Sequence, residues 1–289
     1  MNKRNVHRTV EVPGFVVVKH LGSGARSTIW QVRQHRTGKS FALKRIIKNE
    51  ASDDRFFQQA ANEHAVAQHF DHPVVRKIYR LKRIRRFIRV REIHMLMELC
   101  EGATLQDKRP QEIDEIIGIF LKVADGISHI NSRGFIHADI KPNNIVVGPD
   151  GEVKIIDLGH SCSIGKIKTR VQGTPDYIAP EQAERRPLDV RTDVFNLGAT
   201  MYWVLTGQAI PTVLPKGDGV MLKQDMSITP PEILNPAVPL PLSKLVIECV
   251  ELLPRRRPQA IKAVTARLEL CRHALSRRSS WPIIELPPE

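Results

Sequence analysis

Four polar side chains in two short segments have the types and spacing needed for phosphoryl transfer. The segment HADIKPNN supplies Asp139, Lys141 and Asn144, and the segment IIDLG places Asp157 eighteen residues after Asp139. The reaction needs a carboxylate that accepts a hydroxyl proton, an ammonium group that holds the transferring phosphate, and oxygen ligands for Mg²⁺. These residues supply those groups in that order. HADIKPNN alone could be an ordinary Pro/Asn turn, but chance does not explain the whole set.

A second constellation lies earlier in the chain, where the segment LGSGARSTIW joins two predicted strands. Gly22 and Gly24 would let the backbone approach phosphate groups closely and point its N–H groups at them. Two neighbouring glycines alone usually indicate only a turn. Lys44, on the next predicted strand, could neutralise phosphate charge, and Glu63 on the following helix could pair with that lysine.

Composition limits the class of protein. The chain has 289 residues, of which 42% are hydrophobic and 26% charged, and this is typical of a soluble globular protein with one or two domains. Its four cysteines are far apart and form no C-x-x-C pair, so we expect a reducing compartment and neither a zinc module nor a disulfide framework. No apolar run approaches the roughly 20 residues that span a bilayer. The basic start is not followed by an apolar signal region, and we expect a cytoplasmic protein.

The excess positive charge of +13 is confined to the first third of the chain. Residues 1–95 contain 21 Lys/Arg and 7 Asp/Glu, and residues 76–92 contain nine basic residues among seventeen. Apolar residues alternate with these charges, which predicts a hairpin with one basic face. Such asymmetry indicates an acidic partner, either a protein surface or an anionic membrane, with nucleic acid disfavoured but left open. The alternative is a solvated strand edge whose charges discourage pairing with other chains.

Hydrophobic periodicity and turn residues predict two domains. Residues 15–47 are typical of strands and turns, and residues 52–70 of a helix capped by Ser52 or Asp53. After Gly102 the pattern becomes helical, and residues 207–241 are a Pro-rich loop before helices at 242–253 and 260–275. We therefore expect a small β-rich domain over residues 1–98, a larger helical domain over 99–276 and a tail over 277–289.

Over about residues 14–275 the sequence resembles the protein kinase family. Gly22/Gly24, Lys44, Glu63 and HADIKPNN match the glycine loop, strand lysine, helix glutamate and catalytic loop of that family, in the family's order. Asp157-Leu158-Gly159 and Ala179-Pro180-Glu181 match its D-F-G and A-P-E motifs. A lysine two places after Asp139 resembles Ser/Thr rather than Tyr kinases. The segments around GTPDYIAPEQ and TDVFNLGATMYWVLTG are similar to bacterial, eukaryotic-like kinases.

The resemblance implies an α+β, bilobal kinase-like fold, with a small β-rich N-lobe that carries one helix and a larger helical C-lobe. It implies ATP and Mg²⁺ as cofactors, with Mn²⁺ as a substitute, and protein Ser/Thr hydroxyls as acceptors. Asp139, Lys141, Lys44 and Glu63 would be catalytic, and Asn144 and Asp157 would hold the metal. Nucleotide contacts would come from Leu21, Gly22, Ser23, Gly24, Ile29, Ala42, Lys44, Met97, Glu98, Cys100 and Val146. Thr174 would brace Asp139 and Lys141, Asp193 would hold the catalytic-loop backbone, and Arg257 would pair with Glu181.

Two departures from the family pattern change what we expect. Ala138 replaces the arginine that normally receives a phosphorylated activation-loop residue. We therefore predict activity that does not depend on phosphorylation of Ser161, Ser163 or Thr169. Arg26 occupies the tip of the glycine loop, where its side chain could contact a phosphate or lie in solvent, and we expect it to lie in solvent.

Three functions from different classes fit these residues. An active Ser/Thr protein kinase uses all of them. A pseudokinase or scaffold, binding partners through the basic N-lobe, has no chemical need for Lys44, Asp139, Asn144 and Asp157 together. A small-molecule phosphotransferase shares the Asp…Asn…Asp core, but Thr174, Arg257 and the A-P-E segment are typical of a peptide-binding platform.

Overall fold

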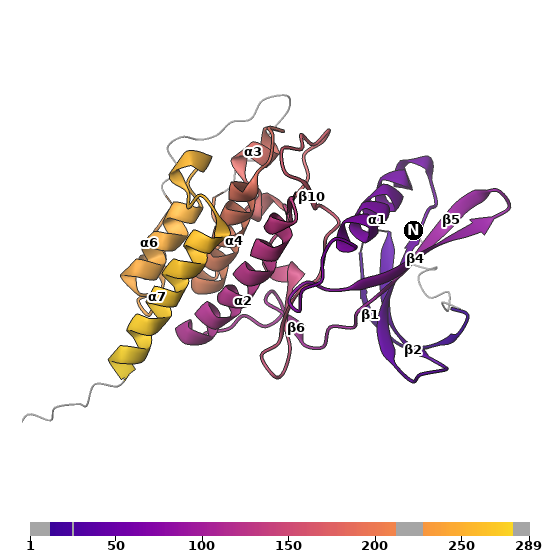
Figure 1. Cartoon of the computed structure of the whole chain (residues 1–289), viewed down its shortest axis with the longest axis horizontal. Coiled ribbons are helices and arrows are strands. Elements are labelled where there is room, and N and C mark those ends of the chain that lie inside the picture. The colour runs from indigo at the N-terminus through magenta and orange to yellow at the C-terminus, as the bar shows by residue number, and fades with distance from the viewer. Residues whose placement is uncertain (1–11, 25, 212–227, 280–289) are drawn as a thin grey trace, which may run out of the picture. The chain divides into compact units, whose positions relative to one another are not determined.

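The computed structural model describes residues 12–24, 26–211 and 228–279 (Figure 1). The described chain forms two compact units. Residues up to 71 and residues 76–100 belong to the first unit, and residues 72–75 and those from 101 onward belong to the second. The first is rich in strands and the second in helices, which confirms the predicted α+β class.

The first unit is built on an antiparallel sheet with the strand order β1-β2-β3-β5-β4. Its strands are β1 (Phe15–Ser23), β2 (Ser27–Gln34), β3 (Ser40–Ile47), β4 (Ile78–Arg86) and β5 (Arg89–Met97). A 3-10 turn, η1 (Ala51–Asp53), leads into the helix α1 (Asp54–Ala67). β-branched and aromatic residues are frequent in these strands, as expected for a pleated, half-buried surface.

Alternation of side chains gives the sheet two apolar faces. On one face, Ile46 and Ile93 pack with Ala60 of α1. On the other face, Val32 and Leu43 form a second cluster, which is only partly covered. Because successive residues of a strand point to opposite faces, Lys44 lies on the face that α1 covers.

The basic stretch predicted as a hairpin at residues 76–92 is the β4–β5 hairpin, although its second strand continues to Met97. The two strands pair from Ile78↔Met97 to Arg86↔Arg89, so that two residues, Phe87 and Ile88, form the turn.

The second unit consists mainly of helices around one apolar core. Its helices are α2 (Ile113–Ser132), α3 (Pro180–Ala183), α4 (Val190–Thr206), α5 (Pro231–Leu234), α6 (Leu240–Cys249) and α7 (Ile261–Ser279). α4 ends at Gly207, which has φ 76° and so takes the left-handed position that closes many helices. Gly198 allows α4 and α6 to pack closely, because a Cβ there would lie 2.4 Å from the Cβ of Cys249.

Short strands and turns fix the polar segments of the second unit. β6 (Ala103–Thr104), β8 (Ile145–Val147) and β9 (Val153–Ile155) form one small sheet, and β7 (Phe135–Ile136) pairs with β10 (Cys162–Ser163). Three 3-10 turns complete the unit: η2 (Pro142–Asn144), η3 (Pro175–Tyr177) and η4 (Pro254–Arg256). The segment HADIKPNN therefore runs from the end of β7 into η2.

Several element boundaries differ from the sequence-based expectation. The helix predicted at 52–70 begins at Asp54, with Asp53 at its N-cap position, one of the two residues predicted there. The Asp53 carboxylate makes no cap hydrogen bond to α1, because it accepts the N–H groups of Asn49 and Glu50 instead. Within the predicted loop 207–241, residues 231–234 form α5 and α6 begins at 240, while residues 212–227 lie outside the described residues. α7 continues to Ser279, and the rest of the predicted tail also lies outside them. Among the described residues, no helix is long and apolar enough to cross a membrane.

Candidate functional site

In the first unit, Lys44 of β3 forms an ion pair with Glu63 of α1. The Lys44 Nζ lies 2.7 Å from Glu63 Oε2, and the glutamate side chain is fully buried. Arg76 supplies a second cation, with its Nη2 3.5 Å from Glu63 Oε1. A buried carboxylate is stable only when cations or hydrogen-bond donors compensate its charge, so this pair fixes Lys44 against α1.

The other residues predicted to contact a nucleotide in this unit lie along β1, β2, β3 and the end of β5. The register pairs Gly22 with Ile29 and Ala42 with Met97. A Cβ atom on Gly22 would meet no atom within 4 Å, so the backbone is open there. The remaining members of this set are Leu21 and Ser23 in β1, Gly24 directly after it, and Glu98 and Cys100 directly after β5.

The segment after β5 is tied to the start of the hairpin. The Glu98 N–H donates to the Lys77 carbonyl oxygen at 2.9 Å, and the Glu98 carboxylate accepts the Lys77 N–H at 3.0 Å. The Cys100 thiol lies 3.9 Å from the Glu98 carbonyl oxygen. These contacts fix Glu98, one of the residues predicted to contact a nucleotide, beside the residue directly before β4.

The expectation that Arg26 lies in solvent is wrong. Its Nε lies 2.8 Å from Asp53 Oδ1, and a second contact of 3.8 Å reaches Glu50. The Asp53 side chain is only 4% exposed. A carboxylate this buried requires a cation, which explains why Arg26 turns towards the start of α1.

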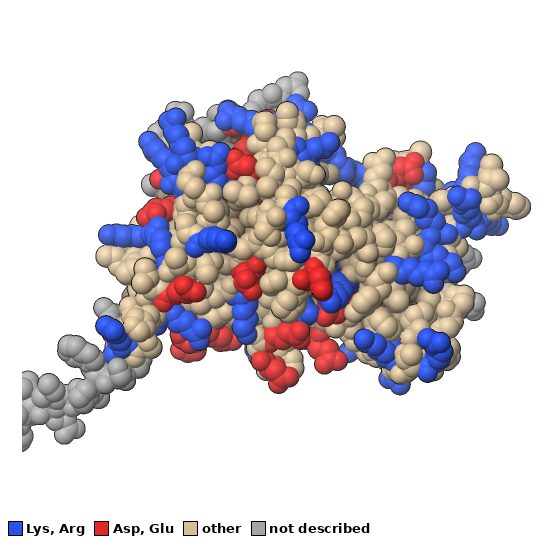
Figure 2. All heavy atoms as spheres, viewed as in Figure 1, with Lys and Arg blue, Asp and Glu red and all other residues tan. Residues whose placement is uncertain are grey.

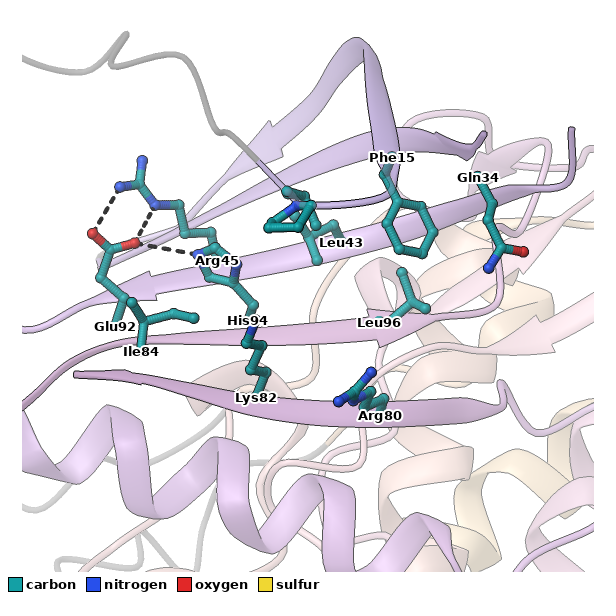
Figure 3. A pocket seen from close by; sticks show the side chains of 12 residues that line it. Phe15, Gln34, Leu43, Arg45, Arg80, Lys82, Ile84, Glu92, His94 and Leu96 are labelled. Carbon is teal, nitrogen blue, oxygen red and sulfur yellow. Dashed lines mark hydrogen bonds and ion pairs between the residues drawn. The ribbon is translucent and has the colours of Figure 1, made fainter. Parts of the chain in front are cut away.

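A pocket of about 590 Å³ opens on the other face of the first unit's sheet (Figure 3). Phe15, Leu43 and Leu96 supply apolar walls, and Arg80 and Lys82 project from β4 beside them. Since Leu43 and Lys44 are neighbours on one strand, this pocket lies on the opposite face from the Lys44–Glu63 pair.

One edge of that pocket is closed by a charged network that joins β3 to the hairpin. Arg45 donates two hydrogen bonds to Glu92, of 2.7 and 2.9 Å, and the His94 Nε2 lies 3.2 Å from the same carboxylate (Figure 3). The hydrogen bonds from Arg45 lower the pKa of Glu92 against the opposing effect of burial. Burial lowers the pKa of His94, in spite of the nearby Glu92. The network therefore anchors β5 to β3 near neutral pH.

In the second unit, the carboxylate of Asp139 lies at the centre of a polar cluster. Lys141 Nζ lies 2.9 Å from Oδ2, the Thr174 hydroxyl lies 3.2 Å from Oδ1, and the Asn144 amide nitrogen lies 3.2 Å from Oδ2. Burial raises the pKa of Asp139, but His160 and Lys141 outweigh this effect and lower the pKa below its ordinary value. Asp139 is therefore an ionised carboxylate at neutral pH, able to accept a proton or a hydrogen bond.

Asp193 of α4 holds the backbone directly before Asp139. Its carboxylate accepts the N–H of His137 at 2.9 Å, the N–H of Ala138 at 2.8 Å and an amide N–H of Asn131 at 2.9 Å. Ala138 has φ 60°, a left-handed conformation that is unfavourable for a residue with a Cβ. Burial raises the pKa of Asp193. His137 is also fully buried, and its Nδ1 accepts the N–H of Asp139 at 3.2 Å, which is a packing role as expected.

Thr174 links the catalytic loop to the segment before α3. The Lys141 Nζ donates to its hydroxyl oxygen at 2.6 Å, and the hydroxyl donates to Asp139. Gln182 of α3 adds a further link, because its amide donates to the Ala138 carbonyl oxygen at 2.8 Å. Asp139, Lys141 and Thr174 are thus brought together as the sequence predicts.

Asn144 and Asp157 have the chemistry of ligands for a hard cation. The Asn144 amide nitrogen donates to the Asp139 carbonyl oxygen at 2.8 Å, so the amide oxygen is the atom left to face a metal. Asp157 follows β9, and its Oδ1 accepts the Gly159 N–H at 2.8 Å. The N–H of Ile156 donates to the Asn144 carbonyl oxygen at 2.9 Å, which brings the two segments side by side. Carboxylate and amide oxygens fit Mg²⁺. Val146 lies two residues after Asn144, in β8.

Glu181 and Arg257 form a buried pair with two parallel hydrogen bonds. Arg257 Nη1 lies 2.7 Å from Glu181 Oε1, and Nη2 lies 2.9 Å from Oε2. Thr192 of α4 also donates to this carboxylate, at 2.9 Å. The pair joins α3 to the segment before α7 and holds the A-P-E segment in place.

Three contributors to these clusters were not predicted from the sequence. Arg76 reaches Glu63, Gln182 reaches Ala138, and His160 Nδ1 lies 3.3 Å from Asp139 Oδ2. Arg76 looked like one charge in a basic run. His160 directly follows the D-L-G motif, and its position beside that motif was the only sequence signal that could have identified it.

Comparisons with known proteins agree with the fold. A sequence model of the protein kinase domain matches residues 15–268, and the chain belongs to the protein kinase family. It is 27% identical over 256 residues to a probable serine/threonine-protein kinase of Clostridium acetobutylicum, covering 85% of this chain and 38% of that protein. It is similar to the serine/threonine-protein kinase PknD of Chlamydia caviae, at 26% identity over 88% of this chain and 31% of the relative.

A third relative, the serine/threonine-protein kinase PrkC of Bacillus subtilis, is 25% identical over 81% of this chain and 37% of its own length. The chain therefore spans between about a third and two fifths of these relatives. The resemblance to the kinase family that the motifs indicated is confirmed.

Proposed function

We propose that the chain is a serine/threonine protein kinase that transfers the γ-phosphate of ATP to hydroxyl groups of protein substrates. The observation that carries this proposal is the ionised Asp139 carboxylate with Lys141 and Thr174 hydrogen-bonded around it. The names of the bacterial relatives support the same activity.

Each residue of the cluster has a separate task in this proposal. Asp139 orients the acceptor hydroxyl and takes up its proton, and Lys141 neutralises the negative charge that develops on the transferring phosphate. Thr174 positions both side chains through its hydroxyl group. Asp193 holds the His137 and Ala138 N–H groups, which fixes the direction of the Asp139 side chain.

The cofactors would be ATP and Mg²⁺, with Mn²⁺ as a substitute, and the bound cation supplies charge stabilisation to the phosphates. Asn144 and Asp157 would hold the cation through their oxygen atoms. Lys44, fixed by Glu63, would hold the α- and β-phosphates, and the open backbone at Gly22 leaves room for them. The adenine base would be contacted by the residues predicted to bind the nucleotide, which lie between Leu21 and Cys100 in the first unit and include Val146 in the second.

We also propose that activity does not depend on phosphorylation of the activation loop. The Ala138 side chain packs in an apolar cluster with Ile136 and Leu188, so the position that usually presents a cation presents a methyl group. Of the three candidate acceptors, Ser161 is buried, whereas Ser163 and Thr169 are exposed. Equal phosphotransfer rates before and after phosphatase treatment would support this, and a large loss after treatment would contradict it.

A cytoplasmic location is part of the proposal. What supports it is the cysteine pattern, because four cysteines that are far apart in the sequence and form no C-x-x-C pair are typical of a reducing compartment.

The test is transfer of label from γ-³²P-ATP in the presence of Mg²⁺ to the chain itself, to basic and acidic generic proteins, and to sugars and aminoglycosides. Phosphoserine or phosphothreonine that is absent with Asp157→Asn and with EDTA is the expected result. Label on a small molecule would favour the small-molecule phosphotransferase. No transfer, with ATP binding and fold retained, would favour the scaffold.

A further inference from the structure

The turn of the β4–β5 hairpin exposes two large apolar side chains next to each other. Phe87 is 92% exposed and Ile88 is 88% exposed. Among the other described residues, the most exposed large apolar side chains are Ile233 and Leu270, both at 68%. Isolated exposed apolar residues are common, but an adjacent pair at a protruding tip is not explained by packing within this chain.

The backbone of this turn also disfavours Phe87. A two-residue hairpin turn prefers glycine or asparagine where φ is positive. Phe87 has φ 55°, and a bulky residue in that region is an outlier. Neither local conformation nor burial in the first unit therefore accounts for an aromatic and a β-branched residue at this tip.

Cations surround the apolar tip. Five exposed arginines follow the two strands next to the turn, and in the part of the chain that the structure describes none of them has an acidic partner. They are Arg83, Arg85, Arg86, Arg89 and Arg91. Figure 2 shows the hairpin, at the right of the view, as a blue group of basic side chains with uncharged atoms beyond it. By contrast, Glu92, which lies opposite Ile84 in the same hairpin, is paired with Arg45 of β3.

We propose that the β4–β5 hairpin binds the surface of an anionic membrane, with Phe87 and Ile88 inserted into the interface and the arginines against lipid headgroups. Interfacial segments combine apolar side chains, which enter the headgroup boundary, with Lys/Arg side chains that face anionic lipids. The hairpin carries its apolar side chains at the turn and its arginines on the two strands that lead to the turn. This interaction goes beyond the proposed kinase activity and does not depend on it.

A bilayer fits this tip better than a folded protein does. The tip is convex and only two residues wide, so a protein partner would need a preformed apolar hole lined by acidic groups. A bilayer deforms around an inserted side chain and presents negative charge on every side of it. The unpaired arginines match this arrangement because they lie on both strands of the hairpin.

The test is sedimentation of the full chain with vesicles of phosphatidylcholine alone and of phosphatidylcholine with 30% phosphatidylglycerol. We expect binding to the anionic vesicles, and weaker binding at high salt because screening reduces attraction to the headgroups. The variant Phe87→Asn/Ile88→Gly removes the apolar tip and places an asparagine, which tolerates the left-handed region, at the position with positive φ, so the turn is retained. We expect it to bind at least about tenfold more weakly.

The charge component has its own variant and control. Replacing Arg85, Arg86 and Arg89 with Gln should weaken binding by about two orders of magnitude, from about fivefold for each arginine. Replacing the exposed Arg36, Arg133 and Arg255 with Gln removes the same charge elsewhere and should weaken binding far less. Leu270→Gln is the matched control for the tip, because it removes an exposed apolar side chain from α7.

Insertion of the tip into the bilayer is measured with the variant Phe87→Trp. The fluorescence of the added tryptophan is obtained by subtracting the fluorescence of the unsubstituted chain. Brominated lipid in anionic vesicles should quench this fluorescence, whereas it should not quench that of the tryptophan in Leu270→Trp.

Three results would overturn the proposal: no binding of the unsubstituted chain to anionic vesicles at low salt, equal binding of Phe87→Asn/Ile88→Gly, or equal quenching of the two tryptophans. Retention on poly-glutamate or DNA without vesicle binding would assign the hairpin to an acidic protein or to nucleic acid instead. None of these measurements uses ATP, so their failure is independent of the kinase proposal.

Discussion

The catalytic loop and the hairpin tip each contain a non-glycine residue with a left-handed backbone, Ala138 at φ 60° and Phe87 at φ 55°. Ala138 is 1% exposed, its N–H donates to Asp193, and its carbonyl oxygen accepts from Gln182. Phe87 is almost fully exposed, and the pairing of β4 with β5 holds its turn. The same local strain is thus supported by buried hydrogen bonds in one place and by a strand ladder in the other.

This difference separates two uses of strain. Residues in unfavourable backbone regions persist only where the surroundings enforce them, and such residues are frequent at functional sites. At Ala138 the enforced backbone directs the next side chain, Asp139. At Phe87 the strained backbone does not position another residue of the site, and its effect is to expose the Phe87 side chain itself.

The largest expected effect comes from removing the support of Ala138. Asp193→Ala would leave the His137 and Ala138 N–H groups buried without their acceptor, and we expect the second unit to lose about 3–5 kcal/mol of unfolding free energy. Urea unfolding checks this. Asp150→Ala, in an exposed turn, is the control and should change stability by less than about 0.5 kcal/mol. Similar losses in the two variants would show that Asp193 does not hold the loop.

A smaller effect, on rate rather than stability, is expected at Thr174. Thr174→Val keeps the shape but removes the hydroxyl that joins Lys141 to Asp139, and we expect kcat to fall about tenfold to a hundredfold with ATP affinity unchanged. Thr174→Ser restores the hydroxyl and should recover most of the rate. Steady-state kinetics of both variants with one protein substrate decides this, and no recovery by Ser would count against a positioning role.

The ion pair that joins the hairpin to β3 should respond to acid. The pKa of Glu92 is lower in the folded chain than its ordinary value of 4.5, so its contribution to stability is present above that pH and is lost as pH falls through the folded pKa. Glu92→Gln should therefore cost about 1 kcal/mol at pH 7 and much less near pH 3. Thermal melting of both proteins over that range measures the difference. A cost that does not change with pH would contradict the role of the ionised pair with Arg45.

The smallest effects are expected when each of the two strained residues is replaced with glycine. Glycine removes the left-handed penalty at either position but adds backbone entropy to the unfolded chain. Phe87→Gly loses no packing and should stabilise the first unit by about 0.5–1 kcal/mol. Ala138→Gly also loses a methyl group packed with Ile136 and Leu188, so its net effect should be near zero. Hydrogen exchange in each segment measures the change in local stability for both variants. Stabilisation by Ala138→Gly together with no effect of Phe87→Gly would contradict the comparison.

Sequence motifs were sufficient to predict the fold class and the residues that cluster around Asp139. They predicted these because Asp139, Lys141 and Asn144 lie within six residues, so local spacing already fixes their proximity. Arg26, Arg76 and His160 were misplaced or missed. Their partners Asp53, Glu63 and Asp139 lie between 13 and 27 residues away, and these contacts, unlike those of Thr174 with Asp139 and of Arg257 with Glu181, belong to none of the motifs used.

The hairpin shows the same limit in another form. Charge and alternation predicted a basic hairpin, but Phe87 and Ile88 have none of the residue types that mark a tight turn, so the tip could not be located from the sequence. Its position follows only from the pairing of Arg86 with Arg89.

The most direct measurement is the single-turnover rate of γ-phosphate transfer by Asp139→Asn and by Asp150→Asn. Both variants replace a carboxylate with an amide of the same shape, but only Asp139 lies in the cluster with Lys141 and Thr174. We predict that Asp139→Asn transfers phosphate at least about a hundredfold more slowly than the unsubstituted chain, while Asp150→Asn matches it. Equal rates for the two variants, with folds intact, would contradict the assignment of Asp139 as the residue that activates the acceptor hydroxyl.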